Sequence, residues 1–277
     1  MSGFSNEWLR LREPADIAAR NPEVANAVAA RFALRDEIRV VDLGCGTGAN
    51  LRATSSLLPN IQTWTLVDNN PELLEAARGA LSAWADDAEH LGTGLLLKKG
   101  NASITVAFMP ADLATNLESV FGKAPALVTT SAFCDLVSEA FIRSLARKCA
   151  EHVAAFYAVL TYNGLQRWSP HRPADNQIAG AFHRHQLSDK GFGPAAGPMA
   201  ASLIADQFKL NGFLVLEGES PWVLGRNDRM LVDELVHGYA TAAGETGGVD
   251  AKTLETWVKV QRNGAEIGHT DTFAVPA

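Results

Sequence analysis

The sequence predicts a doubly wound α/β fold: a mostly parallel sheet of seven strands, flanked by helices, with a helical and loop cap inserted late in the chain. Two observations favour it. Short apolar runs, typical of buried strands, alternate with capped helices through the first half of the 277 residues. The first run ends in closely spaced glycines that lead directly into a helix, as in the opening unit of such folds.

The predicted elements follow in order along the chain. Apolar runs predict strands at 38–43, 63–67, 104–108, 126–130, 153–160, 213–217 and 267–275. Helical spacing and capping residues predict helices at 15–33, 49–58, 71–84, around 141–145, and at 174–187, 199–210, 228–243 and 250–262. Because parallel strands need crossover connections, this alternation favours helices on both faces of the sheet.

The domain organisation is one main domain with additions. We expect an N-terminal helical segment at 1–37 and a main domain at 38–277. Within the main domain, a cap insertion at about 161–198 is rich in Pro, Gly, His and Arg, and a helical insertion follows at about 228–262.

Composition limits the classes of function. The formal net charge of -7 and the pI near 5.5 disfavour nucleic acid as a partner, since phosphate binding needs clustered positive charge. No apolar run approaches the roughly 18 residues of a membrane span, and residues 1–12 are too polar for a signal peptide. We therefore expect a cytoplasmic protein without a membrane partner. Cys45, Cys134 and Cys149 lack metal-binding spacing, so reduced thiols and no metal site are expected.

The strongest motif lies between the first strand and its helix. Asp42 is followed by Gly44, Gly46 and Gly48, and glycines at this spacing allow a sharp turn and close approach of the backbone to a ligand. Asp68 ends the next strand, where a carboxylate can accept both hydroxyl hydrogens of a ribose.

At these residues the chain resembles the class I S-adenosylmethionine-dependent methyltransferase family, whose loop has the form acid-x-Gly-x-Gly-x-Gly. The resemblance covers roughly residues 38–160. It implies a Rossmann-like methyltransferase fold with S-adenosyl-L-methionine as cofactor: the glycine loop holding the methionine part, Asp68 the ribose and Asp112 the adenine amino group. The resemblance and the neighbouring positions together give these candidate cofactor-binding residues: Asp42, Gly44, Cys45, Gly46, Gly48, Asn50, Asp68, Asn69, Asp112, Leu113 and Ser131.

Three alternatives stay open. The run from Gly44 to Ala49 also satisfies the dinucleotide form G-x-G-x-x-G/A, which predicts an NAD-dependent oxidoreductase, although that form leaves Asp42 and the third glycine unexplained. A protein that binds the cofactor without catalysis is a second alternative. For Asp112, a helix N-cap is the alternative role.

The acceptor is expected at the carboxyl ends of the strands, under the cap. The hypothesis is a small anionic molecule, because the cap carries more cationic than anionic side chains. The candidate substrate residues are Tyr162, Arg167, Arg184 and Lys190. A solvated surface explains the same charges. His183 and His185 are candidate general bases, with surface or capping histidines as the alternative. His269 and Asp271 form either an orienting pair or part of a solvated face.

Overall fold

The computed structural model describes residues 5–277, so residues 1–4 of the predicted N-terminal segment lie outside the described residues. One mixed sheet runs through the whole molecule in the order β3-β4-β5-β2-β1-β6-β7-β10-β8, and β9 pairs with β10 beside β8. Its strands are β1 (Glu37–Leu43), β2 (Ile61–Asp68), β3 (Asp87–Leu91), β4 (Gly94–Lys99), β5 (Ala102–Pro110), β6 (Leu127–Ser131), β7 (Ala155–Ser169), β8 (Phe213–Glu219), β9 (Trp222–Leu224) and β10 (Gly264–Pro276).

The central strands are parallel and the outer ones are antiparallel. β5, β2, β1, β6 and β7 pair in parallel, whereas β10 runs antiparallel to β7, β8 and β9. β3 and β4 add an antiparallel hairpin outside β5. The α/β class is confirmed, with a last strand inserted in reverse between β7 and β8.

The predicted number of strands is wrong: the sheet in residues 5–277 has ten strands, not seven. All seven predicted strands are present, and the additional ones are β3, β4 and β9. β3 is an edge strand with mostly exposed residues, and β9 has only three residues, so neither produces an apolar run that can be recognised in the sequence. β4 buries Leu95 and Leu97 in alternation, a signal that the prediction missed.

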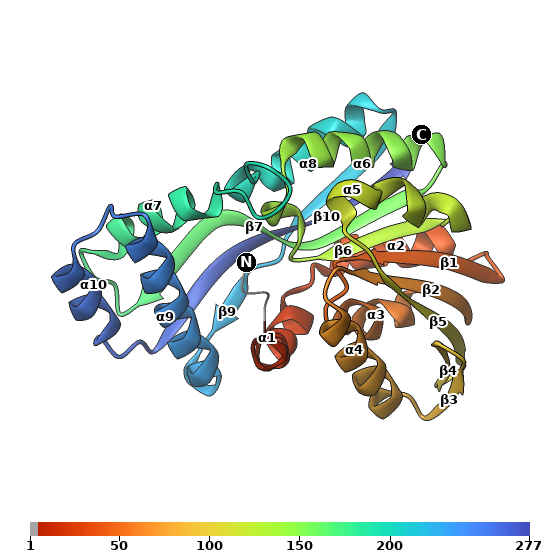
Figure 1. The fold of residues 1–277 in the computed structure, drawn as a ribbon, viewed down its shortest axis with the longest axis horizontal. Coiled ribbons are helices and arrows are strands. Elements are labelled where there is room, and N and C mark those ends of the chain that lie inside the picture. The colour runs from red at the N-terminus through yellow and green to blue at the C-terminus, as the bar shows by residue number, and fades with distance from the viewer. Residues whose placement is uncertain (1–4) are drawn as a thin grey trace.

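Helices cover both faces of the sheet (Figure 1). Val40 of β1 faces the core beneath α2 (Pro22–Phe32), α3 (Ala49–Thr54) and α4 (Pro71–Trp84). Its neighbour Val41 faces the opposite core, under α5 (Leu113–Asn116), α6 (Glu139–Glu151) and α8 (Ala200–Leu210). Successive strand residues thus serve two separate cores, which is the doubly wound arrangement.

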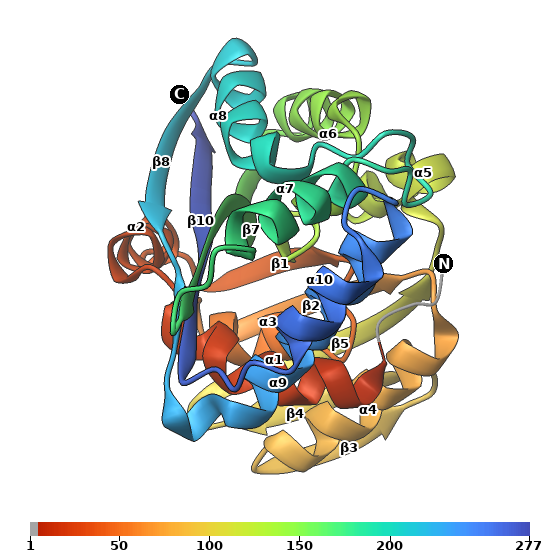
Figure 2. The same cartoon turned by 90° about the vertical axis from the view of Figure 1, so that its left-hand side faces the viewer.

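A third core lies at one end of the molecule, at the left in Figure 1. The second half of β7 (161–169) and the first half of β10 (264–268) extend beyond the central sheet, and α7 (Asp175–Gln186), α9 (Arg229–Glu245), α10 (Ala251–Val258) and β9 pack around them. We call this part the distal lobe. Figure 2 views it from its outer side.

Helix α1 (Asn6–Ala19) lies between the distal lobe and the glycine-loop end of the sheet (Figures 1 and 2). The sequence predicted one helix over 15–33, but the structure has two, because Arg20 and Asn21 leave the helical conformation and Asn21 caps α2 ahead of Pro22. Within residues 5–277, no helix is both long and apolar enough to cross a membrane.

Candidate cofactor and acceptor site

The candidate site lies where the direction of the strand order reverses. β1 pairs with β2 on one side and β6 on the other, and the chain leaves these strands toward opposite faces of the sheet. Ligands of open α/β sheets bind outside the carboxyl ends of the strands at such a point. Gly44 follows β1 and Ala132 follows β6, and Thr130 donates a hydrogen bond of 2.8 Å to the Leu43 carbonyl between them.

The glycine loop has a backbone that side chains rarely adopt. Gly44, Gly46 and Gly48 have φ values of 64°, 52° and 74°. A Cβ at Gly44 would lie 2.7 Å from the Phe133 ring, and one at Gly46 would lie 3.2 Å from Leu9 of α1. The three glycines are therefore required both by conformation and by close contact.

Asp68 braces this loop from the end of β2. Its Oδ2 accepts a hydrogen bond of 2.9 Å from the Gly46 N–H, and its Oδ1 accepts one of 2.9 Å from the Asn70 N–H. Each carboxylate oxygen has a second lone pair, so Asp68 can hold the loop and still accept a ligand's hydroxyl hydrogens.

Asp42 acts from beneath the loop. Its carboxyl is fully buried, with Oδ1 accepting a hydrogen bond of 2.8 Å from Asn50 and Oδ2 without a partner. Burial raises the pKa of Asp42 to about 7, against the Asn50 hydrogen bond, which lowers it. Asn50 is held in turn by Arg20, whose Nη2 donates to its Oδ1 at 2.9 Å. Asp42 and Asn50 thus support the loop instead of facing outward from it.

The other candidate cofactor residues surround the same strand ends. Cys45 is buried against the core below α3, and Asn69 is exposed beside Asp68. Asp112 is the N-cap of α5, accepting a hydrogen bond of 2.9 Å from the Ala114 N–H, and Leu113 is buried behind it. Ser131 ends β6. The N-cap role considered for Asp112 is therefore real, and it uses one oxygen of the carboxylate.

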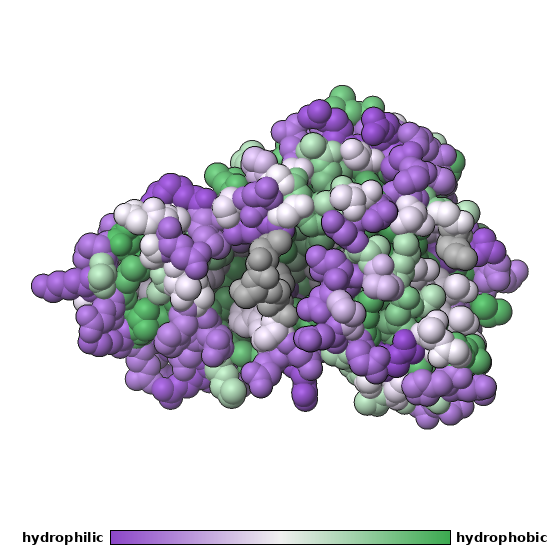
Figure 3. Space-filling view, viewed as in Figure 1, coloured by the Kyte–Doolittle hydropathy of each residue, from purple (hydrophilic) through white to green (hydrophobic). Residues whose placement is uncertain are grey.

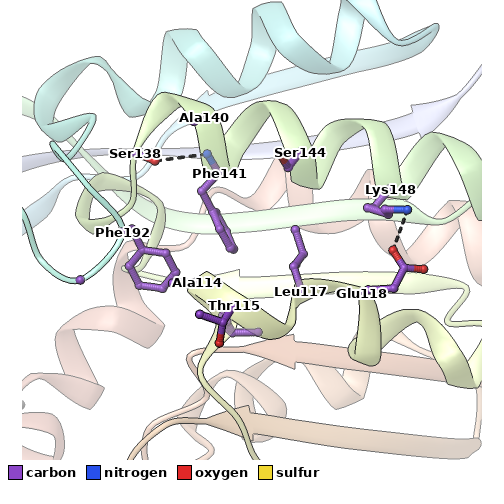
Figure 4. Close-up of a pocket in the computed structure, with 12 residues that line it drawn as sticks. Ala114, Thr115, Leu117, Glu118, Ser138, Ala140, Phe141, Ser144, Lys148 and Phe192 are labelled. Carbon is purple, nitrogen blue, oxygen red and sulfur yellow. Dashed lines mark hydrogen bonds and ion pairs between the residues drawn. The ribbon is translucent and has the colours of Figure 1, made fainter.

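A cavity of about 440 Å³ opens beside Leu113 (Figure 4). Its lining includes Leu113, Phe141 and Phe192, together with the ion pair of Glu118 and Lys148. Phe133, which covers Gly44, packs edge-on against Phe141 and Phe192 with ring centroids 6.0 and 5.6 Å away. The aromatic wall over the glycine loop is thus continuous with the side of this cavity.

Helix α1 covers the loop from the other side. Leu9 contacts Gly46, and Glu13 forms a two-point ion pair with Arg52 at 2.8 and 2.7 Å. Arg52 also donates to the Thr47 carbonyl within the loop at 2.8 Å. On its other side, α1 reaches the distal lobe, where Trp222 donates to Asp16 at 3.1 Å. The helix therefore joins the loop to the distal lobe.

Of the residues predicted to bind or deprotonate the methyl acceptor, Tyr162 and His183 are in contact, whereas His185 lies elsewhere. Tyr162 and His183 are hydrogen-bonded through the phenol oxygen and Nε2 at 3.0 Å. Burial lowers the pKa of His183, so the neutral form is favoured at neutral pH. His185 instead pairs with Glu245 at 2.9 Å near the surface.

The three predicted cationic residues lie apart. Arg167 is exposed on β7 and pairs with Glu266 at 2.9 Å. Arg184 is exposed and packs against Gly248, while Lys190 donates to the His185 carbonyl and the Ser188 hydroxyl within its own turn. Their role in substrate binding stays a prediction, and the structure brings no cluster of these cations together.

The sequence prediction missed a buried polar group next to Tyr162. Asp135 lies four residues beyond Ser131, is 6% exposed, and leaves its Oδ1 without a hydrogen bond. Burial raises its pKa to about 6. Near it lie Gln186 of α7 and Arg12 of α1. No local motif connects these residues, since the fold brings them together from four elements.

His269 and Asp271 do not form the pair considered from the sequence. Asp271 is fully buried and accepts hydrogen bonds from the backbone of Asn21 and Leu160 at 2.9 and 2.8 Å. His269 packs against Trp222, and burial lowers its pKa to about 3. Both residues are internal, so the solvated-face alternative is also wrong. Within residues 5–277, no cluster of three His, Cys, Asp or Glu side chains is arranged to bind a metal.

Comparison with known proteins found similarity among solved structures only. No protein-family model and no curated protein matches the chain. A cyclopropane-fatty-acyl-phospholipid synthase-like protein from Lactobacillus casei is 12% identical with a TM-score of 0.53, covering 99% of this chain and 94% of that one. A candidate methyltransferase from Bacillus halodurans is 10% identical with a TM-score of 0.50, covering 93% and 100%. This chain has the Rossmann-like methyltransferase fold.

A third similar structure contains S-adenosylhomocysteine. The mycolic acid cyclopropane synthase CmaA1, solved with S-adenosylhomocysteine, is 10% identical with a TM-score of 0.52, covering 98% of this chain and 94% of that one. At such identities the likeness is one of fold, and the chemistry has to be argued from the residues of this chain.

Proposed function

We propose that this protein is an S-adenosyl-L-methionine-dependent methyltransferase that acts on a small-molecule acceptor. The observation that carries the proposal is the loop of three left-handed glycines at the end of β1, braced by the Asp68 carboxylate at the end of β2. This pairing offers bare backbone and a hydroxyl acceptor side by side, which suits the methionine and ribose parts of the cofactor.

The strand order supports a methyl donor over NAD. The dinucleotide fold has six strands in the order 3-2-1-4-5-6. Here the last strand, β10, is instead inserted antiparallel between β7 and β8. The oxidoreductase alternative therefore receives no support beyond the glycine spacing itself.

When bound, the cofactor would supply an activated methyl group on a positively charged sulfur. The residues of this chain would then mainly align the reacting atoms, a contribution that reaches roughly 7–11 kcal/mol in favourable cases. Gly44, Gly46 and Asp68 would hold the donor, with Asp112 near the adenine. Tyr162 and His183 would lie on the acceptor side of the donor. The catalytic role of His183 and His185, the absence of a nucleic-acid partner and the cytoplasmic location stay predictions.

Calorimetric titration tests the proposal. Wild-type protein is expected to bind S-adenosylmethionine and S-adenosylhomocysteine but not NAD. Asp68→Ala is expected to weaken both by about tenfold or more, because hydrogen bonds to a charged group contribute roughly 1.5–3 kcal/mol. The control, Asp206→Ala, changes an exposed acid of α8 and is expected to leave binding unchanged.

Each other outcome has a definite meaning. Binding of NAD alone would overturn the proposal. Binding of S-adenosylmethionine with no formation of S-adenosylhomocysteine across an acceptor screen would favour the non-catalytic alternative. Asp68→Asn retains one oxygen that can still accept from the Gly46 N–H. This variant therefore separates loss of the ribose contact from loss of the Gly46 contact. Circular dichroism checks that each variant is folded.

A further inference from the structure

Two buried acceptor atoms near Tyr162 lack hydrogen-bond donors. Asp135 Oδ1 and Gln186 Oε1 are both buried and unpaired. Unpaired buried acceptors are uncommon, and each calls for an explanation such as an unfilled ligand position. Here the two side chains are neighbours, since the Gln186 amide lowers the pKa of the Asp135 carboxyl, against the larger effect of burial.

The orientation of the Gln186 amide follows from this contact. Its Nε2 is the donor toward Asp135, because the reverse orientation would place an amide oxygen against a carboxylate oxygen. Its Oε1 is then directed elsewhere and, like Asp135 Oδ1, accepts nothing. A ligand that satisfies both atoms must carry at least two N–H or O–H donors.

The position fits a reacting group. Asp135 lies in the short helical turn Cys134–Leu136 directly after β6, whose carboxyl end borders the glycine loop through Phe133 and Gly44. Its carboxyl also faces the Tyr162 backbone N–H of β7. Asp135 is therefore on the acceptor side of the same strand ends that carry the proposed cofactor loop.

The Asp135 carboxyl has no ion-pair partner within residues 5–277. The charge of Arg12 reaches it, but Arg12 is bonded to Asp16 at 2.9 Å. Burial lowers the pKa of His183, and that of His269 to about 3, so both are neutral at pH 7. A cation bound beside Asp135 would give this buried carboxylate the partner that it lacks.

Aromatic rings surround the carboxyl. The negative charge of Asp135 reaches the phenols of Tyr162 and Tyr239, whose pKa values burial raises. Phe182 stacks on Tyr239 at 3.9 Å between centroids and meets Tyr162 edge-on at 5.8 Å. Aromatic faces next to a carboxylate are a common environment for an ammonium group.

We propose that the acceptor is a small primary amine, bound as an ammonium ion whose hydrogens are accepted by Asp135 and Gln186. This inference rests on the proposed methyltransferase function and narrows its substrate to an amine that is methylated on nitrogen. A hydroxyl group, with a single hydrogen, would leave one of the two oxygens unpaired. The amine also differs in charge from the anionic acceptor considered from the sequence.

Asp135 can take up the proton that methyl transfer releases. A proton of the ammonium would pass to Asp135, and the nitrogen lone pair that it frees would form the N–C bond to the methyl group of the cofactor. The C–S bond of the cofactor would break, and its electron pair would stay on the sulfur as a neutral thioether. Asp135 then returns its proton to water as the methylated ammonium product leaves.

Matched amines and alcohols test the inference. The probes are phenethylamine, histamine and 1,4-diaminobutane, each compared by calorimetry with the corresponding alcohol, in the presence and absence of S-adenosylhomocysteine. The amines are expected to bind about tenfold or more tightly than the alcohols, because charge-assisted hydrogen bonds are roughly twice as strong as neutral ones. Asp135→Asn should remove most of this preference, Gln186→Leu part of it, and the exposed control Asp206→Asn none.

The pH dependence separates a binding role from a structural one. Amine affinity should fall as the pH decreases through about 6, where Asp135 gains its proton, and this change should be absent in Asp135→Asn. The charged or titratable groups facing Asp135 are Arg12, Cys134, Tyr162 and Tyr239. Burial raises the pKa values of Cys134, Tyr162 and Tyr239, and none of the four groups changes charge in this range.

Equal affinity for amines and alcohols, no amine binding, or full amine binding by Asp135→Asn would each overturn the inference. Failure of the proposed function is seen separately, as failure of the wild-type protein to bind S-adenosylhomocysteine in the same titrations.

Discussion

At the scale of single residues, the site depends on backbone conformations and buried groups that most substitutions cannot reproduce. The loop glycines have positive φ and lie against Phe133 and Leu9. Their role was predictable because three spaced glycines between a strand and a helix are visible in sequence. The roles of Asp135 and Arg20 were not predictable from the sequence, because each residue acquires its partners only when distant segments meet.

Gly44→Ala separates strain from contact when compared with Gly92→Ala. Both positions have positive φ, 64° and 57°, but a Cβ at Gly44 meets Phe133 whereas one at Gly92 meets nothing within 4 Å. Each variant should lose about 1–2 kcal/mol of stability to the left-handed conformation, with more lost at Gly44. Only Gly44→Ala should also weaken S-adenosylhomocysteine binding, as measured by calorimetry. Equal binding by the two variants would contradict the role given to the loop.

The buried carboxyl of Asp42 should make stability depend on pH. Its pKa is raised by burial from 3.8 to about 7, so between these pH values the folded protein retains a proton that the unfolded chain has released. The free energy of unfolding from this group therefore decreases as pH rises across the interval. Asp42→Asn should reduce the difference in melting temperature between pH 5 and pH 8. The difference that remains should come from other buried carboxyls, such as Asp135. An unchanged difference would show that Asp42 is ionised in the folded state.

At the scale of elements, helix α1 is the part that sequence reasoning described least well. Residues 6–14 were placed in a helical segment but not assigned to a defined helix, because the buried residues of α1, Arg12 and Asp16, are charged and give no apolar stripe. The turn at Arg20 and Asn21 that separates α1 from α2 was missed as well, although Asn21 before Pro22 is a recognisable helix start. The central helices were predicted because each has a single buried face, and the central strands because burial on both faces gives short apolar runs.

The ion pair between Glu13 and Arg52 should fix α1 to the glycine loop. Both side chains are largely buried, with exposed fractions of 19% and 9%. Glu13→Gln leaves the Arg52 charge without its partner and should cost about 1–3 kcal/mol, whereas Glu139→Gln at an exposed pair of α6 should cost less than about 0.5 kcal/mol. Hydrogen exchange should become faster at the amides of α1 in the first variant only. Equal exchange in both would mean that apolar contacts alone hold the helix.

At the scale of the whole molecule, β7 and β10 unite the central sheet and the distal lobe. Their pairing runs from Phe156 and Ala274 in the centre to Ser169 and Gly264 in the lobe, with two irregularities on the way. The sequence indicated strands at these places but not their full length, since Tyr162–Ser169 has polar residues among the apolar ones and was assigned to the cap. The domain boundaries expected from the sequence stay predictions. Strand β7 crosses the one at about residue 161, where the cap was expected to begin.

A sheet that crosses the molecule should unfold as one unit. Thermal unfolding followed by far-ultraviolet circular dichroism and by tryptophan fluorescence should give a single midpoint, since cooperative unfolding gives coincident transitions with different probes. Trp257→Phe removes a hydrogen bond of 2.7 Å to Asp175 in the distal lobe and should shift both midpoints together. Two separate midpoints would show that the lobe unfolds independently.

The contact of Leu9 with Gly46 also has a consequence for rates. A cofactor bound against the loop as proposed would pass α1 on entering and on leaving, and the opening of this helix would then set an upper limit on turnover that is independent of the chemical step. The apparent affinity for the cofactor would be reduced in proportion to the fraction of molecules in which α1 is open, since only these can take up the ligand. A mutation that loosens α1 should therefore accelerate exchange of the cofactor even where it slows the reaction, and the time that a product stays bound becomes a property of the N-terminal helix.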